Sequence, residues 1–150
     1  MQKFLVILFF LLINPCIVIA EENNYFVSLK KNKVYVRYGP GKNYPIKYIY
    51  KKKFLPIKVI DKKDNFRRII DHKKNSGWIH QIMLRKLNSL IMLEEKIVFK
   101  KNSKFSKPLV KLEKGRLVIL KKCISDWCKI KSGNYSGWLR TQNSWGEIIK

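Results

Sequence analysis

Acidic residues, histidine and cysteine are scarce in this sequence. Its 150 residues include 10 Asp and Glu, 2 His and 3 Cys. The acidic residues are scattered, so the pair of carboxylates that a glycoside hydrolase needs is not indicated. His72 and His80 match no standard zinc spacing, and neither is placed near a cysteine that it could activate as a nucleophile. Because a glycine-rich phosphate loop is also missing, the sequence predicts a protein that is not an enzyme and holds no cofactor or metal.

Helical periodicity is equally scarce after residue 20. The best helical stretch is 87–95, and we interpret it as a linker because its pattern is short. Short runs of alternating apolar and polar residues, separated by turn residues, predict strands instead. In the first half of the chain these runs are residues 34–38, 46–50, 54–60, 66–71 and 78–79. The sequence therefore predicts an all-β fold.

The charge of the chain is strongly one-sided. Its 33 Lys and Arg give a net charge of +23. Such a field favours anionic partners such as nucleic acid, anionic lipid or an acidic wall polymer. The accompanying richness in Lys, Ile and Asn is also typical of a low-GC genome, so the basic surface is either functional or a product of composition.

The N-terminus has the pattern of a secretory signal peptide. Lys3 precedes the apolar run 4–13, and small or tolerated residues end at Ala20 before the acidic Glu21. We therefore predict a signal peptide over 1–20, cleavage between Ala20 and Glu21, and a periplasmic or otherwise extracytoplasmic location. The membrane would be contacted only before cleavage. An uncleaved anchor is the alternative, although the run is short for a span. Export also argues against nucleic acid as a specific partner.

Two cysteines remain after that cleavage. Cys123 and Cys128 flank the turn residues Ser125 and Asp126, which places them near the end of a predicted hairpin. In an oxidising compartment such a pair is expected to form a disulfide. Closing so short a loop should contribute about 2 kcal/mol. A zinc site or a redox pair is the alternative, but the spacing fits neither standard pattern.

The strand pattern repeats about sixty residues later. Five segments of the second half match five of the first: 97–100 with 34–37, 107–110 with 44–47, 117–120 with 54–60, 127–130 with 66–69, and 136–139 with 76–79. A repeat of this length is the size of a small barrel rather than a solenoid unit. We therefore predict one domain over 21–86, a linker over 87–95 and a second domain over 96–147.

Several of these motifs resemble one known family. Residues 34–41 (VYVRYGPG) with 44–46 (YPI) are similar to the opening strand and loop of bacterial SH3-like domains. The cysteine-flanked Trp127, the Gly-Trp-Leu at 137–139 and the Trp-Gly at 145–146 resemble tandem SH3-like proteins of α-proteobacteria. The resemblance implies two small five-stranded β-barrels outside the cytoplasm. Related modules target the cell wall or bind peptidoglycan.

Two departures from that family pattern bear on the site. The loop at 101–104 lacks the Gly-Pro-Gly of the first copy, and Tyr48 stands where the family often has Trp. We therefore expect a ligand groove on the first copy, because aromatic rings and an Arg suit a peptide or glycan stem. The candidate residues are Arg37, Tyr38, Tyr44, Tyr48 and Trp78. The predicted function is a non-catalytic module that binds cell-wall polymer or its peptides. An adaptor for an envelope protein and a nonspecific polyanion binder are the alternatives.

Overall fold

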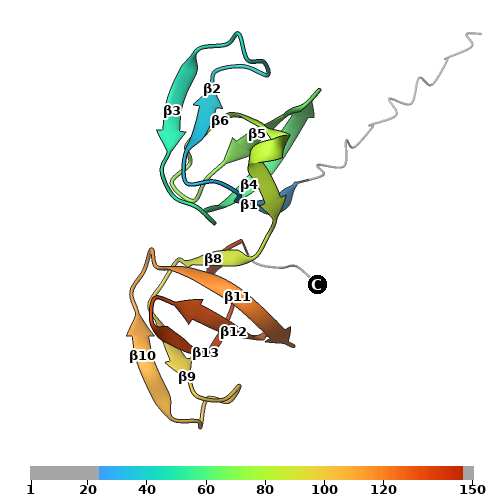
Figure 1. Cartoon of the computed structure of the whole chain (residues 1–150). Coiled ribbons are helices and arrows are strands. Elements are labelled where there is room, and N and C mark those ends of the chain that lie inside the picture. Colours follow the sequence, from blue (N-terminus) through green and yellow to red (C-terminus); the bar gives the residue numbers. More distant parts are fainter. Residues whose placement is uncertain (1–23, 147–150) are drawn as a thin grey trace, which may run out of the picture.

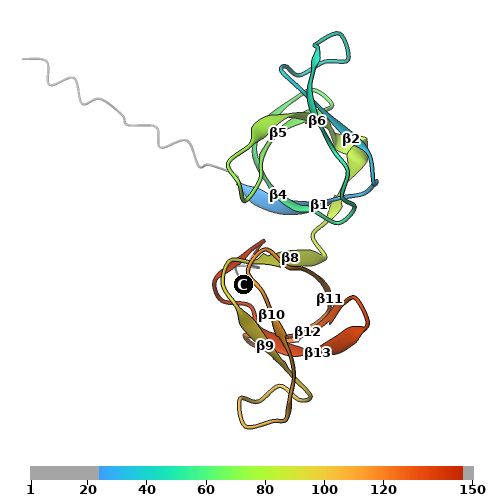
Figure 2. The same ribbon diagram turned by 90° about the vertical axis from the view of Figure 1, so that its left-hand side faces the viewer.

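A computed structural model of the chain describes residues 24–146. The predicted signal peptide, with its cleavage between Ala20 and Glu21, lies outside these residues. The described part is built from two β-sheets that follow one another along the sequence and each curl into a small barrel (Figures 1 and 2). The prediction of an all-β fold with two tandem barrels is confirmed.

The first barrel contains seven strands and one short 3-10 helix. In chain order they are β1 (Tyr25–Leu29), β2 (Val34–Arg37), β3 (Ile46–Tyr50), β4 (Pro56–Lys63), β5 (Phe66–Ile70), β6 (Ser76–His80), η1 (Gln81–Met83) and β7 (Leu84–Lys86). Their order in the sheet is β3-β2-β6-β5-β4-β1-β7. The five runs predicted from sequence correspond to β2–β6, whereas β1 and β7 are additional.

The second barrel repeats this arrangement. Its strands are β8 (Ser89–Met92), β9 (Lys96–Phe99), β10 (Pro108–Leu112), β11 (Leu117–Ile124), β12 (Trp127–Ser132), β13 (Tyr135–Arg140) and β14 (Ser144–Trp145). The order β10-β9-β13-β12-β11-β8-β14 places each strand like its counterpart in the first barrel. All strand pairs are antiparallel, and hairpins join β4–β5–β6 in the first barrel and β11–β12–β13 in the second.

Alternation along the strands builds each core. Val34 and Val36 of β2 and Ile79 of β6 are fully buried, while the residues between them face outward. In the second barrel Val98 of β9 and Leu139 of β13 take the same inward positions. Burial of these aliphatic side chains is the main favourable term for barrels of this size.

The structure aligns β9 with β2 one residue differently from the alignment predicted from the sequence. Gly77 lies against Val36 and the Arg37 carbonyl, and Gly137 lies against Val98 and the Phe99 carbonyl. Arg37 therefore corresponds to Phe99, not to Lys100 as the match of 34–37 with 97–100 implied. The sequence alone did not fix this alignment, because β2 and β9 are both short runs of mixed apolar and basic residues.

The predicted linker over 87–95 contains a structured element. Residues 89–92 form β8, whose four residues are all buried and which pairs with β11 and β14. The linker interpretation is therefore corrected for this part of the segment. The physical reason is that Leu90, Ile91 and Met92 are apolar side chains that a solvent-exposed connection would leave in water.

The two barrels share an interface. The Ser28 and Ser89 hydroxyls lie 2.7 Å apart in a buried contact, and Ser89 Oγ also donates to the Phe54 carbonyl. Trp145 packs edge-on against Phe26 with ring centroids 5.2 Å apart, and its indole N–H donates to a carbonyl of β4. Side chains of the second barrel thus help to bury the first.

The predicted disulfide between Cys123 and Cys128 is present. The two residues are directly opposite on β11 and β12, with Cα atoms 4.1 Å apart. Ser125 between them has φ 55°, the left-handed conformation of a tight two-residue turn. The pattern of turn residues and cysteines therefore identified both the hairpin and its crosslink.

Candidate functional site

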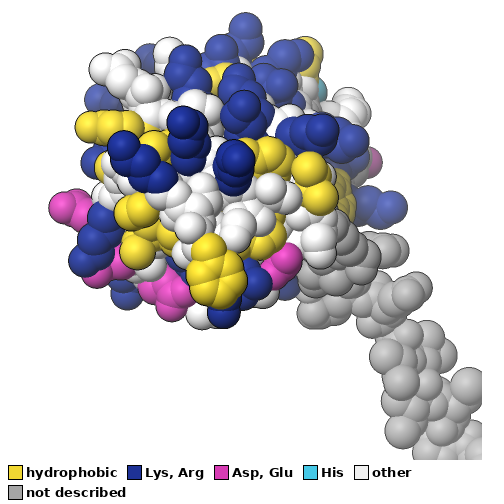
Figure 3. Space-filling view, turned by 90° about the horizontal axis from the view of Figure 1, so that it is seen from below, with side chains coloured by type: hydrophobic (Ala, Val, Ile, Leu, Met, Phe, Trp, Pro, Cys, Tyr) yellow, Lys and Arg dark blue, Asp and Glu magenta, His cyan; other side chains and the backbone are white. Residues whose placement is uncertain are grey.

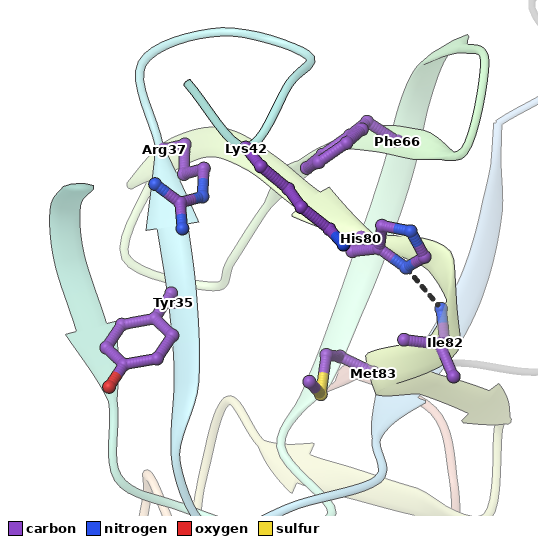
Figure 4. A pocket seen from close by; sticks show the side chains of 7 residues that line it. All are labelled: Tyr35, Arg37, Lys42, Phe66, His80, Ile82 and Met83. Atoms are coloured by element: carbon purple, nitrogen blue, oxygen red, sulfur yellow. Dashed lines mark hydrogen bonds between the residues drawn. The ribbon is translucent and has the colours of Figure 1, made fainter. Parts of the chain in front are cut away.

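A groove of about 320 Å³ opens on the outer surface of the first barrel (Figure 4). Its lining comes from β2, the β2–β3 loop, β5, the end of β6, and η1: Tyr35, Arg37, Lys42, Phe66, His80, Ile82 and Met83. The lining combines apolar side chains with the basic side chains of Arg37 and Lys42 and contains no acidic residue. A groove of this composition suits a ligand that has both an apolar part and a negative charge.

Strand pairing brings these residues together. Arg37 lies opposite Trp78, and Phe66 lies opposite His80. Because side chains alternate along a strand, all four share the outer face of the sheet, while Ile69 and Ile79 fill the inside. Phe66 and His80 pack edge-on with ring centroids 5.1 Å apart, which forms one wall of the groove.

The same wall continues along the turn that follows β6. His80 Nδ1 accepts a hydrogen bond from the Ile82 amide at 3.3 Å and so caps η1 (Figure 4). The short helix then holds Ile82, which is 63% exposed, and Met83 beside the groove. An exposed isoleucine next to a half-buried methionine supplies apolar surface that a ligand can cover.

The two basic side chains of the groove, Arg37 and Lys42, come from β2 and the β2–β3 loop. Arg37 Nη1 donates to the Tyr44 carbonyl at 2.7 Å, which fixes the guanidinium while leaving its other N–H donors available. Lys42 reaches from the β2–β3 loop towards His80 in Figure 4. The three ion pairs of residues 24–146 involve neither of these side chains. A carboxylate in the groove would therefore find unneutralised positive charge.

The sequence-predicted candidates occupy different places. Arg37 lines the groove, whereas Tyr38, Tyr44, Tyr48 and Trp78 do not belong to its lining. Tyr38 is 63% exposed beside Lys47 at the base of the β2–β3 loop, and Trp78 is half-buried on the outer face opposite Arg37.

Tyr44 lies in the β2–β3 loop and packs against the glycines of that loop. Its ring lies so close to Gly39 that a Cβ at that position would be 2.2 Å from it, so the ring requires glycine there. With its carbonyl on Arg37, Tyr44 thus ties the loop to the cation of the site. Tyr44 is therefore a positioning residue rather than a lining one.

Tyr48 belongs to a polar network on the inward face of β3. Its hydroxyl lies 3.4 Å from that of Tyr50, which donates to Asp71 Oδ2 at 2.9 Å. Burial raises the pKa of both tyrosines, and for Tyr50 the Tyr48 hydroxyl and the Asp71 carboxylate add to the effect. Both hydroxyls therefore stay protonated and donate, which makes this network a structural element.

Asp71 is the acceptor at the centre of this network and is 3% exposed. Burial alone would raise its pKa, but hydrogen bonds from the Asn75 side chain and amide, from Tyr50 and from the Lys73 amide outweigh that effect and lower it. The carboxylate organises the turn between β5 and β6, so it fixes the strand that carries Trp78 and His80.

Sequence reasoning missed most of the lining. Phe66 and His80 could have been found, since pairing the run 66–71 with 78–79 places them on the face of Arg37. Lys42 gave no signal beyond lying in a predicted loop. Ile82 and Met83 had none, because a 3-10 turn of three residues leaves no periodic pattern.

The equivalent place in the second barrel is filled. Phe99, which corresponds to Arg37, packs against Trp127 with ring centroids 5.8 Å apart. Arg140, which corresponds to His80, lies over Trp127 at 5.4 Å. Polar Gln142 and Asn143 follow β13 where Ile82 and Met83 follow β6. The side chains at these positions therefore differ between the barrels, and a ligand groove on the first copy stays a prediction.

Residues 24–146 contain no group of three or more His, Cys, Asp or Glu side chains that could hold a metal ion. In the same range, no helix has the length and apolar character needed to cross a bilayer.

Comparison with solved structures gives matches at low sequence identity. NlpC2 from Trichomonas vaginalis is 12% identical with a TM-score of 0.39, over 86% of this chain and 51% of that one. NlpC1 from the same organism is 11% identical with a TM-score of 0.37, over 83% of this chain and 46% of that one. This chain thus spans about half the length of either structure. Among curated proteins, none gives a significant match.

Comparison with protein families gives a direct assignment. The profile of the bacterial SH3 domain matches the sequence twice, over residues 30–86 and 95–146, which together exceed half of the chain. The first match covers β2 to β7 of the first barrel, and the second covers β9 to β14 of the second. This protein therefore belongs to the bacterial SH3 domain family and carries the domain in tandem.

Proposed function

We propose that this protein is an exported, non-catalytic binding module that associates with the cell wall through the groove of its first barrel. The ligand is an acidic peptide of the wall polymer. The observation that carries this proposal is the pairing of Arg37 and Lys42 with an apolar wall in a groove that no acidic residue lines. Membership of the bacterial SH3 domain family supports a binding role.

The groove matches such a ligand in two respects. Wall peptides carry carboxylates, and a guanidinium binds a carboxylate through two parallel hydrogen bonds when its donors are free. They also carry aliphatic side chains and stems, which Phe66, Ile82 and Met83 can cover. Extended peptides present both features on one side of a shallow surface groove.

Retention on purified sacculi at moderate salt tests this proposal. We expect Arg37→Ala to lower retention about tenfold, since removing one partner of a charge-assisted hydrogen bond costs roughly 1.5–3 kcal/mol. Tyr44→Ala should lower it less, because the backbone carbonyl that binds Arg37 remains and only the ring that packs against Gly39 and Gly41 is lost. The matched control is Lys121→Ala, which removes one exposed positive charge from β11, away from the groove.

Three results would contradict the proposal in different ways. Equal losses for Arg37→Ala and Lys121→Ala, with binding that fades as salt is added, would indicate bulk charge alone. No retention on sacculi, with one envelope protein co-purifying instead, would favour an adaptor. A product that keeps its N-terminal residues and remains in the cytosol would rule out export; mass spectrometry of the cell fractions detects this directly.

A further inference from the structure

The β9–β10 loop of the second barrel, residues 100–107, presents an aromatic ring among lysines. Its sequence is KKNSKFSK, with four lysines and no acid. Phe105 is 89% exposed, more than any other large hydrophobic side chain of residues 24–146. Lys104 lies over its ring with the ammonium 5.2 Å from the centroid. Such exposure costs solvation free energy, which a partner that covers the ring would recover.

The exposure of Phe105 is built into the loop. The Lys100 amide donates to the Lys107 carbonyl at 2.9 Å, and the Lys101 amide donates to Ser106 Oγ at 2.9 Å. The Phe105 amide donates to Ser103 Oγ at 3.2 Å. These bonds hold the backbone so that the ring points away from the barrel without any core contact. The loop is therefore organised before any partner arrives.

A hollow lies beside the ring. It measures about 410 Å³ and is lined by Lys100, Lys101, Ser103, Phe105, Ser106 and Lys107. None of the ion pairs among residues 24–146 involves a lysine of this loop. The ammonium groups and the serine hydroxyls together provide the donors that a phosphate group needs.

The loop also lies at one end of the molecule. In Figures 1 and 2 it projects from the second barrel on the side opposite the β2–β3 loop of the first. Figure 3 shows the molecule from this end, where Lys and Arg side chains spread between hydrophobic ones and acidic side chains lie mostly towards the margin. A flat anionic surface can therefore reach the loop while the groove of the first barrel remains free.

We propose that the β9–β10 loop docks on an anionic lipid surface, with Phe105 inserted at the headgroup boundary and the lysines on lipid phosphates. The combination of ring and charges favours a bilayer over a dissolved polyanion. Lysines attract either partner, but only a bilayer offers an apolar layer beneath its phosphates that can bury an aromatic ring.

Vesicle co-sedimentation tests this interface. The chain starting at Glu21 is used, because it keeps both complete sheets and omits the apolar run 4–13. Vesicles of phosphatidylcholine with phosphatidylglycerol should bind it, and vesicles of phosphatidylcholine alone should not. Phe105→Ser should lower partitioning about tenfold and Lys104→Gln about fivefold. Phe105→Trp should restore binding.

Matched controls separate this interface from general effects. Tyr135→Ser removes another exposed aromatic ring of the same barrel and should leave partitioning unchanged. Replacing Lys100, Lys101, Lys104 and Lys107 by Gln should abolish binding. The same change at the exposed Lys31, Lys51, Lys121 and Lys122 removes equal charge and should lower binding far less.

Two outcomes would overturn the proposal. If Phe105→Ser binds the anionic vesicles as the unchanged chain does, the ring does not insert. If a soluble polyanion such as polyphosphate binds the loop as tightly as the vesicles do and is equally indifferent to Phe105→Ser, the partner is a charged polymer. Near-UV spectra and thermal unfolding confirm that each variant is folded.

Discussion

The two barrels share one strand order but differ at the same outward-facing positions. In the first, Arg37 stands apart from the Phe66–His80 wall and leaves a groove. In the second, Phe99 and Trp127 pack together in the equivalent place. The core beneath these positions does not explain this difference, since the buried side chains of β2 and β6, and of their counterparts β9 and β13, are aliphatic in both barrels. A few side chains on the outer face therefore decide whether this scaffold opens or fills a site.

The barrels also differ in what secures their hairpins. Asp71 of the first barrel accepts hydrogen bonds from Lys73 and Asn75 of the β5–β6 turn and from Tyr50 of β3, whereas Ser132 occupies the corresponding position of the second barrel. The second barrel has the Cys123–Cys128 disulfide across β11 and β12 instead. One barrel therefore depends on an ionised carboxylate and the other on an oxidised thiol pair.

The largest effect should come from removing the side chain that joins the barrels. We expect Trp145→Ala to lower the free energy of unfolding by about 3 kcal/mol, because a large aromatic contact with Phe26 is lost. Trp145→Phe should keep most of the contact and lose only the hydrogen bond to Pro56, about 1 kcal/mol. Urea unfolding measures both.

Amide hydrogen exchange tests whether Trp145→Ala destabilises strands of both barrels. After Trp145→Ala, protection should fall in β1 and β4 of the first barrel as well as in β8. Loss of protection confined to the second barrel would show that the first is stable by itself and that the shared interface contributes little.

The disulfide should give the next largest effect. Replacing Cys123 and Cys128 by Ser should lower the free energy of unfolding by about 2 kcal/mol, since the closed loop is short. The loss should be confined to the second barrel, with exchange increasing at β11 and β12. Adding reductant to the unchanged chain should reproduce it, and an equal loss at β4 and β5 would contradict the assignment.

Asp71→Asn should destabilise the first barrel by about 1.5 kcal/mol at neutral pH, because an amide cannot accept all of the hydrogen bonds that the carboxylate does. The folded-state pKa of Asp71 is lowered. Its contribution is therefore complete above the unfolded pKa of about 3.9 and is lost as pH falls through the folded pKa. The difference between variant and parent should shrink in acid; a constant difference from neutral to strongly acid pH would refute it.

Arg37→Phe should have the smallest effect on stability and the largest effect on ligand binding in the groove. Arg37→Phe gives the first barrel the side chain that the second has at Phe99. We expect a change in unfolding free energy of about 1 kcal/mol or less, since the position is half-buried on the outer face. Sacculus retention should nevertheless be lost, and unchanged retention would place the ligand elsewhere.

The strands could be predicted from the sequence because buried and exposed residues alternate along them with a period of two. Val34 and Val36, or Ile130 and Leu139, reveal an inward face without any knowledge of partners. The disulfide was equally accessible, since Cys123 and Cys128 flank a recognisable turn. The repeat about sixty residues later indicated two barrels, and the resemblance to the family added their SH3-like fold.

The groove and the interface were less accessible for physical reasons. Lining residues come from strands, a loop and a 3-10 turn, and only pairing in space brings Phe66 to His80. β8 was missed because four consecutive buried residues show no alternation, and their burial arises from both barrels at once. Tyr48 was misplaced in the groove because its inward orientation depends on the register of β3 with β2.

The brevity of the junction between barrels has a mechanical consequence. Only residues 87–88 separate β7 from β8, and the buried Ser28–Ser89 contact lies directly beside them. A tandem pair on a flexible tether samples many separations, whereas this junction leaves no slack. The distance between the two far ends of the molecule is therefore fixed. A ligand bound at one end is held at a constant distance from a ligand bound at the other.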